Sequence, residues 1–445
     1  TRPSFWTSLQ DAVDEIEGGE VALPLAGIEG ALAGVGGIAS SRLYQSLALA
    51  LSANASGVLV IADSQEVPAG TVIPANTRVI VSPGVVLTRA VSSGAWITLG
   101  AGSILEGGEY DGRKAASGMG NAKADVAITV GVNAIFRDAF VHDAGGHGVK
   151  LGAGAFADNV ISSDNGITPG GFGTGDGIYA ADVLGCRFAN CSTTGNARMG
   201  ITVTSNSAPA SATLDNCSST GNGYADYDLE GTGSGNVVDV TARGLKGGTL
   251  SLTCGSFVIA GFRGSNMYSG PTYAADTDVV LSDIVIDGTG DPLELFCNRV
   301  RINGFTVNND RDSGYSASIS VNLLGVIENA IVSGSVYNGL KLNTIALSSG
   351  TWSLVRNVTT DLVASNRYFY LQPRSDRGVV YGDNATIWGV NDGLVTMRGT
   401  SAPGSGDWIA GDTVINTAPS AGGTYQWVCV SGGAPGTWKA VEIGA

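Results

Sequence analysis

The sequence is poor in charged residues and in histidine and lacks long apolar runs, and these shortages exclude several classes of protein. Only 14% of the 445 residues are charged, and 39 acidic residues against 24 basic ones give a net charge of −15. This balance argues against nucleic acid or anionic membranes as partners, because both need a basic face. No stretch of about 20 apolar residues is present, so we predict no membrane insertion. The six cysteines form no CxxC pair and lie near no histidine cluster, so we predict neither a metal site nor a cofactor.

What the sequence has in abundance is a repeated pattern of short strands. Five segments between residues 146 and 254 alternate apolar and polar residues, as strands with one buried face do. Their first residues lie 29, 23, 27 and 23 positions apart, and the intervening turns 190–196 and 216–222 are nearly identical. Such a strand–turn–strand repeat predicts a solenoid of stacked coils, and we interpret it as an all-β, right-handed parallel β-helix. The five segments are 146–151, 175–180, 198–203, 225–230 and 248–252.

Alignment of these repeats predicts which residues share a position on neighbouring coils. Cys191 and Cys217 are equivalent, and we favour free, buried thiols that act as small hydrophobes over a disulfide. Residues predicted to point inward are Val149, Leu151, Ile178, Ala180, Ile201, Val203, Tyr227 and Leu229, and one outward row contains Lys150, Tyr179, Thr202 and Asp228.

Composition and pattern divide the chain into four parts. Residues 1–41 contain a helical stretch and a small-residue segment, which we interpret as a connector or adaptor. Residues 42–112 begin with an amphipathic helix at 42–53, which would cover the open apolar end of the solenoid before the first coils. Residues 113–398 are the main solenoid, expected to carry a glycan groove. Residues 399–445 form a small strand-rich module with three tryptophans.

Two parts of the chain resemble known families. A helix, a short strand–Pro-Ala-Gly–strand run and the turn at 106–112 are similar to the start of pectate-lyase-like and polygalacturonase-like β-helices. Residues 407–439 contain the motifs Gly-Asp-x-Val-x-Asn-Thr-x-Pro and Gly-x-Pro-Gly-Thr-Trp-Lys, and they resemble the C-terminal module of bacteriophage tail fibres and tailspike depolymerases. That module would be a trimerisation cap or a glycan-binding element, and we favour the cap.

Together these resemblances imply a bacteriophage tailspike. Such a protein is a homotrimer of the virion, attached to the phage tail or baseplate through its N-terminal region. It binds and depolymerises a capsule or lipopolysaccharide O-antigen on the bacterial surface. Three-fold association would also cover the flat sheet faces that a lone solenoid exposes.

Three acidic residues of one predicted strand, Asp226, Asp228 and Glu230, would face outward together. Outward neighbours on a strand lie about 6.5–7 Å apart, which falls within the roughly 6.5–9.5 Å carboxyl separation of an inverting glycosidase. One carboxyl group with a raised pKa would protonate the leaving oxygen while the other activates water. We therefore predict an endo-acting glycoside hydrolase, with Asp228 and Glu230 as the preferred pair. A solvated acidic edge is the competing interpretation.

His147 and Asp176 occupy the same position on neighbouring coils and are further catalytic candidates. His147 lies in a Gly-His-Gly triplet that resembles a polygalacturonase motif. The paired aspartates that precede this motif in polygalacturonases are absent here, so pectin cleavage is not carried over. The structural alternative is that His147 caps a turn beside Asp176.

The same face supports two other functions. A polysaccharide lyase would use Tyr179, Lys150 or His147 as the base, and Arg198 or Lys150 would neutralise a uronate carboxylate. A non-catalytic receptor-binding fibre would grip glycan through tyrosines and cut nothing. The predicted substrate-binding residues are Tyr179, Lys150, Arg198 and Tyr224, and the fibre would use Tyr179, Tyr224, Tyr227 or Tyr268. A later acidic and arginine group, Asp283, Asp287, Asp291, Glu294, Arg299 and Arg301, is a further candidate site.

Overall fold

The computed structural model describes most of the chain from Ile38 onward. The described residues are 38–90, 93–116, 124–167, 175–233, 235–288, 293–309, 317–334, 340–344, 351–360, 370–371, 386–391, 394–404, 408–433 and 435–442. The helical stretch expected before residue 38 lies outside them, as does Asp291.

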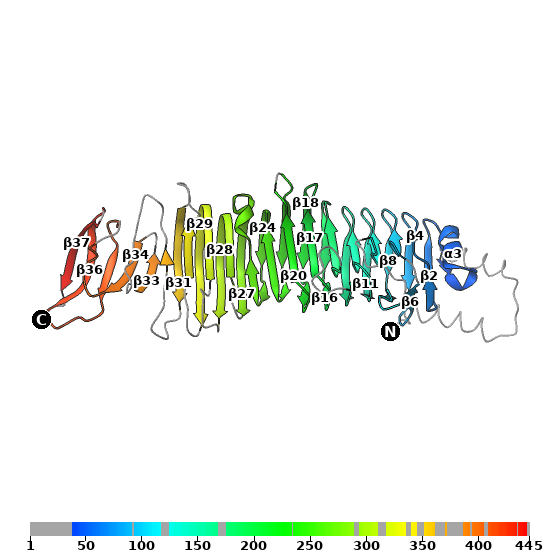
Figure 1. Cartoon of the computed structure of the whole chain (residues 1–445), viewed down its shortest axis with the longest axis horizontal. Coiled ribbons are helices and arrows are strands. Elements are labelled where there is room, and N and C mark those ends of the chain that lie inside the picture. Colours follow the sequence, from blue (N-terminus) through cyan, green and yellow to red (C-terminus); the bar gives the residue numbers. More distant parts are fainter. Residues whose placement is uncertain are drawn as a thin grey trace, which may run out of the picture.

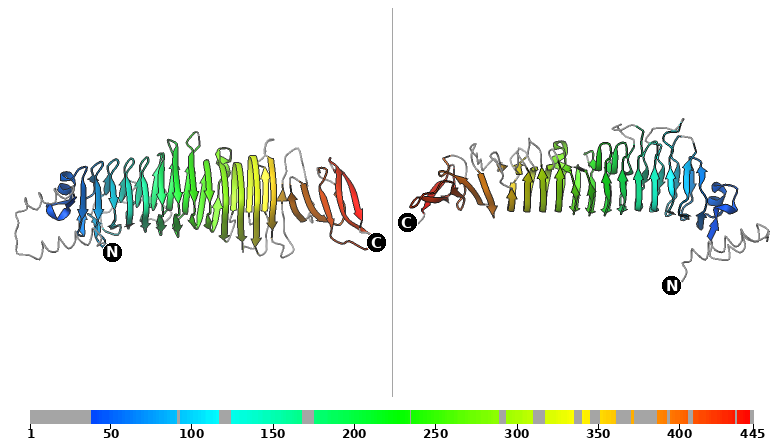
Figure 2. Two further views of the ribbon diagram at one scale, coloured as in Figure 1. Left: turned by 180° about the vertical axis from the view of Figure 1, so that it is seen from behind. Right: turned by 90° about the horizontal axis from the view of Figure 1, so that it is seen from below.

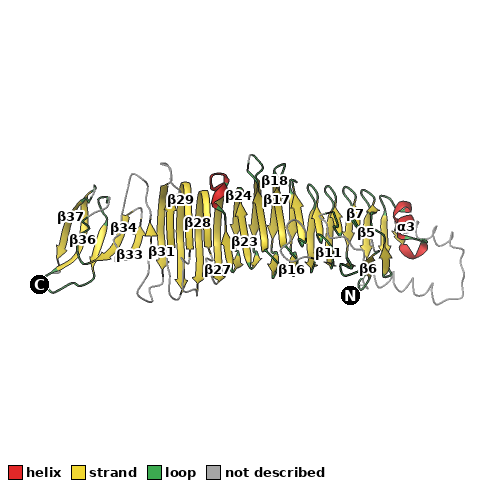
Figure 3. Cartoon of the chain, in the orientation of Figure 1, coloured by secondary structure: helices red, strands yellow, loops and turns green. Residues whose placement is uncertain are grey.

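Short strands stack into an elongated body in which each strand pairs in parallel with the equivalent strand of the next coil (Figure 1). Each coil contributes to three parallel ladders, which follow one another along the chain. The expectation of an all-β chain with parallel strands is confirmed, and helices are confined to short segments (Figure 3). Among the described residues these are η1 (Ser41–Leu43), α3 (Leu47–Ala53) and η2 (Pro271–Asp276).

Ladder 1 carries the candidate site residues. It comprises β4 (Thr71–Ile73), β7 (Ile97–Leu99), β10 (Ile128–Val130), β12 (Val149–Leu151), β14 (Ile178–Ala181), β17 (Met199–Ser205), β20 (Ala225–Gly231), β23 (Thr249–Thr253), β26 (Asn266–Tyr268), the first parts of β28 (Leu293–Asn309) and β29 (Ala317–Gly334), β30 (Leu340–Thr344) and β32 (Tyr370–Leu371).

Ladders 2 and 3 complete each coil. Ladder 2 comprises β1 (Ile38–Ser40), β2 (Val58–Ile61), β5 (Arg78–Val81), β8 (Ile104–Glu106), the first parts of β11 (Ile135–His142) and β13 (Phe156–Ser163), β15 (Cys186–Ala189), β18 (Ala210–Asp215), β21 (Val238–Arg243), β24 (Gly255–Ala260), and parts of β27 (Asp278–Gly288), β28, β29 and β31 (Thr351–Thr360). Ladder 3 comprises β3 (Gln65–Val67), β6 (Val86–Arg89), β9 (Glu109–Asp111), β16 (Ser192–Thr194), β19 (Ser218–Thr220), β22 (Lys246–Gly247), β25 (Arg263–Gly264) and the ends of the longer strands.

The helix α3 lies at the first-coil end of the stack, where a capping helix was expected (Figure 1). It starts at the N-cap Ser46, whose hydroxyl accepts a hydrogen bond from the backbone N–H of Leu49. Its buried residues Leu47, Ala50 and Leu51 join the apolar core, so they cover side chains that an uncapped first coil would expose. Within the described part of the chain, no helix is long and apolar enough to span a bilayer.

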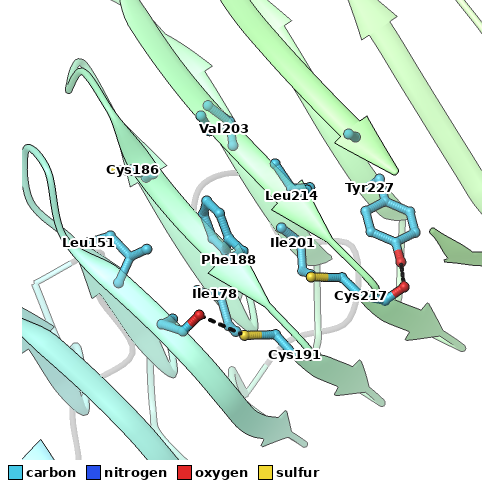
Figure 4. Packing of buried hydrophobic residues seen from close by; sticks show 14 of the residues in the cluster. Leu151, Ile178, Cys186, Phe188, Cys191, Ile201, Val203, Leu214, Cys217 and Tyr227 are labelled. Carbon is cyan, nitrogen blue, oxygen red and sulfur yellow. Dashed lines mark hydrogen bonds between the residues drawn. The ribbon is translucent and has the colours of Figure 1, made fainter. Parts of the chain in front are cut away.

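The predicted register of ladder 1 is confirmed. Ile178 pairs with Val149 on one side and Ile201 on the other, and Ile201 pairs with Tyr227. All four side chains are fully buried, and Figure 4 shows three of them in the core beside Cys191 and Cys217. The six cysteines, all within the described residues, are free and buried, as expected for thiols that pack as small hydrophobes.

The bend between ladders 2 and 3 depends on one residue per coil with a left-handed backbone. Asparagine, aspartate and glycine tolerate this conformation with the least strain, because they can hydrogen-bond locally or have no Cβ. A hydrogen bond also links two neighbouring bends, since the side-chain amide of Asn159 donates to the carboxylate of Asp138 at 2.9 Å. The bend residues are Asp138, Asn159, Asn190, Asn216, Gly244, Gly261, Asp283 and Gly304, with φ between 51° and 79°.

A ladder of buried asparagines runs through the turn that leads from ladder 3 to ladder 1. The side-chain amide of Asn165 donates to Asn196 at 2.8 Å, and that of Asn196 donates to Asn222 at 2.9 Å. Asn222 in turn donates to the carboxylate of Asp226 at 2.7 Å. The Gly-Asn pair that ends each repeated turn in the sequence therefore supplies one rung of this ladder per coil, and Asp226 ends it.

The C-terminal part forms a separate five-stranded sheet at the end opposite α3 (Figure 2). Trp408 and Trp438 pack edge to face in it, with ring centroids 5.3 Å apart. Its strands are β33 (Thr386–Asn391), β34 (Leu394–Gly399), β35 (Thr413–Asn416), β36 (Thr424–Ser431) and β37 (Thr437–Glu442), so the sheet begins before the expected boundary at 399.

The asparagine ladder predicts a large stability effect at Asn196. Replacing Asn196 with Ala removes the acceptor for the buried backbone N–H and side-chain amide of Asn165 and the donor to the Ser162 carbonyl oxygen. Each unpaired buried group costs about 1–3 kcal/mol, so we expect Asn196→Ala to destabilise the protein by roughly 2–5 kcal/mol in urea unfolding. The matched control is Asn206→Ala, which removes an exposed amide and should change stability by less than about 1 kcal/mol. Equal midpoints for the two variants would contradict the role of the ladder.

Candidate functional site

The candidate residues gather on the outward side of ladder 1 from β12 to β26, which we call the site face. One outward row crosses it, with each residue paired to the next: Lys150, Tyr179, Thr202, Asp228, Ser251 and Tyr268. Lys150 is exposed, but Tyr179, Thr202 and Asp228 are only 7%, 0% and 5% exposed. The outward row is therefore a packed polar cluster rather than a solvated surface, which decides its electrostatics.

Asp176 is the charged centre of this cluster and is fully buried. Arg198 donates to both of its carboxylate oxygens, from Nε at 2.6 Å and from Nη2 at 2.8 Å. Burial alone would raise the pKa of Asp176, but the contacts with His147 and Arg198 hold it below its usual range. Asp176 is therefore ionised and fixes the position of the Arg198 guanidinium group.

His147 lies beside Asp176, as the repeats predicted. Its Nδ1 is 3.2 Å from both the backbone nitrogen and the Oδ2 of Asp176. Nδ1 accepts from the first or donates to the second, but it cannot do both with one proton. The ring stacks on Tyr179 with centroids 4.8 Å apart. Its Nε2 is buried and has no partner among the described residues.

Asp228 and Glu230 are the two acidic residues of β20 that lie at alternate positions on the site face. Burial raises the pKa of Asp228 to about 7, an effect to which Glu230 adds and which Arg198 opposes. Glu230 is only partly buried, and burial raises its pKa as well. Asp228 therefore holds a transferable proton near neutral pH, which is the property required of a general acid.

Asp226 does not join this pair. Its carboxylate accepts from the Asn222 amide at 2.7 Å and from the backbone N–H groups of Gly248 and Thr249 at 2.9 and 3.1 Å. The prediction that all three acids of this strand face outward together is wrong, because these donors hold Asp226 at the end of the asparagine ladder.

The coils before Asp226 explain why it turns inward. Gly148, Gly177 and Gly200 precede the inward residues that pair with Tyr227. A Cβ on Gly177 would lie 2.7 Å from the Asn196 amide, and one on Gly148 would lie 2.7 Å from the Asn165 amide. The position that these glycines occupy thus adjoins the asparagine ladder. On the coil of β20 the same position holds Asp226, whose carboxylate bonds to that ladder.

The predicted substrate-binding residues lie in different environments. Tyr224 is 66% exposed, whereas Tyr179 is buried and burial raises the pKa of its hydroxyl group. Burial would lower the pKa of Arg198, but Asp176 raises it, and two of its nitrogens are held by that carboxylate. Tyr227 points into the core, with its hydroxyl oxygen 2.8 Å from the Cys217 carbonyl oxygen, so its suggested role in glycan gripping is wrong.

Two features of the site face were not predicted from the sequence: the role of Ser251 and the unpartnered hydroxyl group of Thr202. Ser251 hydrogen-bonds to Asp228 and occupies its position on the next coil, so the aligned repeats contained the signal for it. The hydroxyl group of Thr202 is buried and has no partner among the described residues. An unsatisfied buried group has no signature in a sequence, because it depends on which neighbours exclude water.

The later acidic and arginine group does not form one site. Asp283 is a bend residue between ladders 2 and 3, Glu294 lies on ladder 1, and Arg299 pairs with Asp278 on ladder 2 at 3.2 Å. These residues therefore lie on different sides of the coil.

One cluster of possible metal ligands lies elsewhere, at Asp111, His142 and Asp143, whose ligand atoms are within 4.8 Å of one another. The two ring nitrogens of His142 contact carboxylates, Asp143 at 2.9 Å and Glu109 at 3.2 Å. Burial would lower the pKa of His142, but these carboxylates raise it above its usual value. Since Lys114 is also 3.4 Å from Asp143, the cluster is best described as an ion-pair network.

Comparisons with known proteins give structural similarity alone. No family model and no curated protein matches the sequence. The A-module of mannuronan C-5 epimerase AlgE6 from Azotobacter vinelandii is similar with a TM-score of 0.44 and 15% identity, over 74% of this chain and 97% of that one. Endo-xylogalacturonan hydrolase from Aspergillus tubingensis is similar with a TM-score of 0.33 and 12% identity, over 71% of this chain and 91% of that one. The Siphovirus 9NA tailspike receptor-binding domain is similar with a TM-score of 0.29 and 10% identity, over 91% of this chain and 98% of that one. Such low values carry no argument about activity, which must rest on the site itself.

The raised pKa of Asp228 predicts a pH-dependent gain of stability on its removal. Near its ordinary pKa of 3.8 the carboxyl group is protonated in the folded chain and partly protonated in the unfolded chain, so Asp228→Asn should change stability by less than about 1 kcal/mol near pH 4. As pH rises toward about 7, the unfolded chain loses this proton while the folded chain keeps it. We therefore expect Asp228→Asn to be more stable than wild type at pH 8, on the order of 2–4 kcal/mol.

Thermal unfolding at pH 4, 6 and 8 measures this difference. Asp239→Asn is the matched control, because Asp239 is exposed on ladder 2. Its effect should stay within about 0.5 kcal/mol at each pH. A wild type that is more stable than Asp228→Asn at pH 8 would show that burial does not raise the pKa of Asp228.

Proposed function

We propose that the protein is a bacteriophage tailspike that binds a bacterial surface polysaccharide, a capsule or lipopolysaccharide O-antigen, and cleaves it by endo-acting hydrolysis. It would act outside the bacterial cell as part of the phage tail. The observation that supports hydrolysis most is the pair on β20, in which a buried carboxyl group with a pKa of about 7 lies two residues from a partly exposed one. The sequence resemblances support the tailspike assignment.

In this mechanism Asp228 is the general acid and Glu230 the general base. Asp228 gives its proton to the glycosidic oxygen as the bond from that oxygen to the anomeric carbon breaks. Glu230 takes a proton from water, and the water oxygen forms the new bond to the anomeric carbon. Alternate residues of a strand are about 6.5–7 Å apart, which leaves room for that water and predicts inversion of configuration.

The other candidates receive supporting roles. Asp176 positions Arg198 and His147 through its buried contacts, and the positive charge of Arg198 limits how far the pKa of Asp228 rises. Asp226 anchors the turn before β20. Tyr224, directly before β20, and Lys150 on β12 are exposed and are proposed to contact the glycan.

A polysaccharide lyase has less support on the same face. Its base must lose a proton readily, but burial raises the pKa of Tyr179. It also needs a cation to neutralise a uronate carboxylate, and Arg198 is already held by Asp176 at 2.6 and 2.8 Å. Hydrolysis needs neither group, so the carboxyl pair is the simpler chemistry here.

We also propose a homotrimer attached to the phage tail through residues 1–41. Val258 and Val280 are neighbours on ladder 2 and each is 43% exposed, which gives the subunit an apolar strip suited to a partner. Light scattering on the purified protein should give three times the subunit mass, and a monomer would contradict this assembly.

Substituting the two acids tests the proposed chemistry. Asp228→Asn and Glu230→Gln should each lower kcat on a polysaccharide that the wild type cleaves by roughly 10²–10⁴-fold, because each removes one proton transfer. Wild-type products should carry new reducing ends and no unsaturated sugar. Activity should fall as pH rises above about 7, since Asp228 must be protonated.

The control Asp239→Asn should keep wild-type activity, because it lies on ladder 2. Full activity in both site variants would exclude the pair. Unsaturated products would replace the hydrolase with a lyase, and binding without any product would favour the non-catalytic fibre.

A further inference from the structure

The charges of the site face carry information about the substrate. Two cations are described on it, Arg198 and Lys150. Arg198 is bound by Asp176 through two hydrogen bonds at 2.6 and 2.8 Å, so these donors are not free for a ligand. Lys150 is exposed but lies three coils from Asp228 along the outward row, about 14 Å at roughly 4.8 Å per coil. An acidic sugar beside the carboxyl pair would therefore meet, as a nearby cation among the described residues, only the Arg198 guanidinium group that is already paired with Asp176.

The acidic residues strengthen this conclusion. Asp176 pairs with Arg198, so the single positive charge of Arg198 offsets only part of the charge of Glu230 and of any charge on Asp228. Glu294 follows Tyr268 on the same face and adds another carboxylate. A uronate, sialate or phosphate group placed here would be repelled in a partly buried environment, where charges are weakly screened.

The remaining groups of the face suit a neutral sugar. Tyr224 is 66% exposed, and Tyr268 is partly exposed two coils beyond Asp228. Tyr268 is near enough to Tyr224, Asp228 and Glu230 for their charges to affect it. Tyrosine rings offer an apolar surface with a polar tip, which matches the hydrocarbon face and hydroxyl edge of a pyranose.

Unpartnered polar atoms lie along the same face. The Oγ1 of Thr202 and the Nε2 of His147 are buried without partners, in residues that are 0% and 1% exposed. The Oδ1 of Asn266, on β26 beside Tyr268, is also unpartnered.

From these observations we propose that the protein takes an uncharged polysaccharide and that Tyr268, with Tyr224, forms the stacking surface for the sugar next to the carboxyl pair. This rests on the proposed function, because it takes the site face as the place where glycan binds. It adds a substrate class, and it places Tyr268, one of the tyrosines named for a glycan-binding fibre, beside the carboxyl pair, where a neutral ligand would contact its ring.

The test uses purified bacterial surface polysaccharides, half of them neutral and half carrying uronate, sialate or phosphate groups. Binding is measured with Asp228→Asn and cleavage with wild type. The bound and cleaved polysaccharides should be neutral, and their affinity should change less than about twofold between roughly 50 and 500 mM NaCl. A uronate polysaccharide that fails to bind has a matched neutral probe, in which its carboxyl groups are chemically reduced to hydroxymethyl groups. If charge alone prevents binding, this reduced polysaccharide should bind.

Variants of Tyr268 examine the stacking surface on any polysaccharide that binds. Tyr268→Ala should weaken binding at least about tenfold, whereas Tyr268→Phe keeps the ring and should stay within about threefold. Tyr425→Ala is the control, because Tyr425 is 46% exposed in the C-terminal sheet. A Tyr425→Ala variant that loses binding while Tyr268→Ala keeps it would overturn the placement on ladder 1.

The outcomes separate this inference from the proposed function. Cleavage confined to acidic polysaccharides would keep the hydrolase and overturn the neutral substrate. Binding of neutral polysaccharides that depends on Tyr268 but gives no cleavage would support the inference and overturn hydrolysis. No binding or cleavage across the whole panel would count against both.

Discussion

The structure depends on the parallel register of its coils, because every other feature repeats through it. Side chains of a strand alternate between two faces, so a slip of one residue would exchange the core with the site face. On ladder 1 that slip would place Tyr179 and Asp228 in the core and expose Ile178 and Tyr227. The asparagine ladder opposes such a slip, since the amides of Asn165 and Asn196 each donate to the equivalent asparagine on the next coil. Register and polar ladder therefore fix the site together.

Within that frame, buried charge determines how the site residues act. Asp176 is tolerated in full burial because Arg198 pairs with both of its oxygens. Asp228 has no such direct partner, and its burial beside Glu230 raises its pKa instead. Two aspartates on one face thus differ in protonation, one held ionised and one able to keep its proton. This difference is what separates a positioning group from a proton donor.

The sequence predicts those features that depend on alternation. The pairing of Lys150, Tyr179, Thr202 and Asp228 could be derived because apolar residues of equal spacing must share one core. Asp226 could not be placed that way, because three hydrogen-bond donors outweigh the alternation at the start of β20. The burial of Asp228 was equally hidden, since it depends on neighbours from other coils. The sequence thus brought Asp228 and Glu230 together as candidates, and the proposed division into acid and base rests on their burial in the structure.

The same burial sets a conflict between stability and chemistry. Keeping the Asp228 carboxyl group inside the cluster destabilises the fold near neutral pH, because the unfolded chain ionises it freely. A solenoid can accommodate this locally, since each coil is stabilised by its contacts with its neighbours and the coils on either side carry no such group. The coil of β20 is also the one where Asp226 takes two backbone donors from the following turn. The strand that carries the buried Asp228 carboxyl group is therefore anchored at its start by the hydrogen bonds of Asp226.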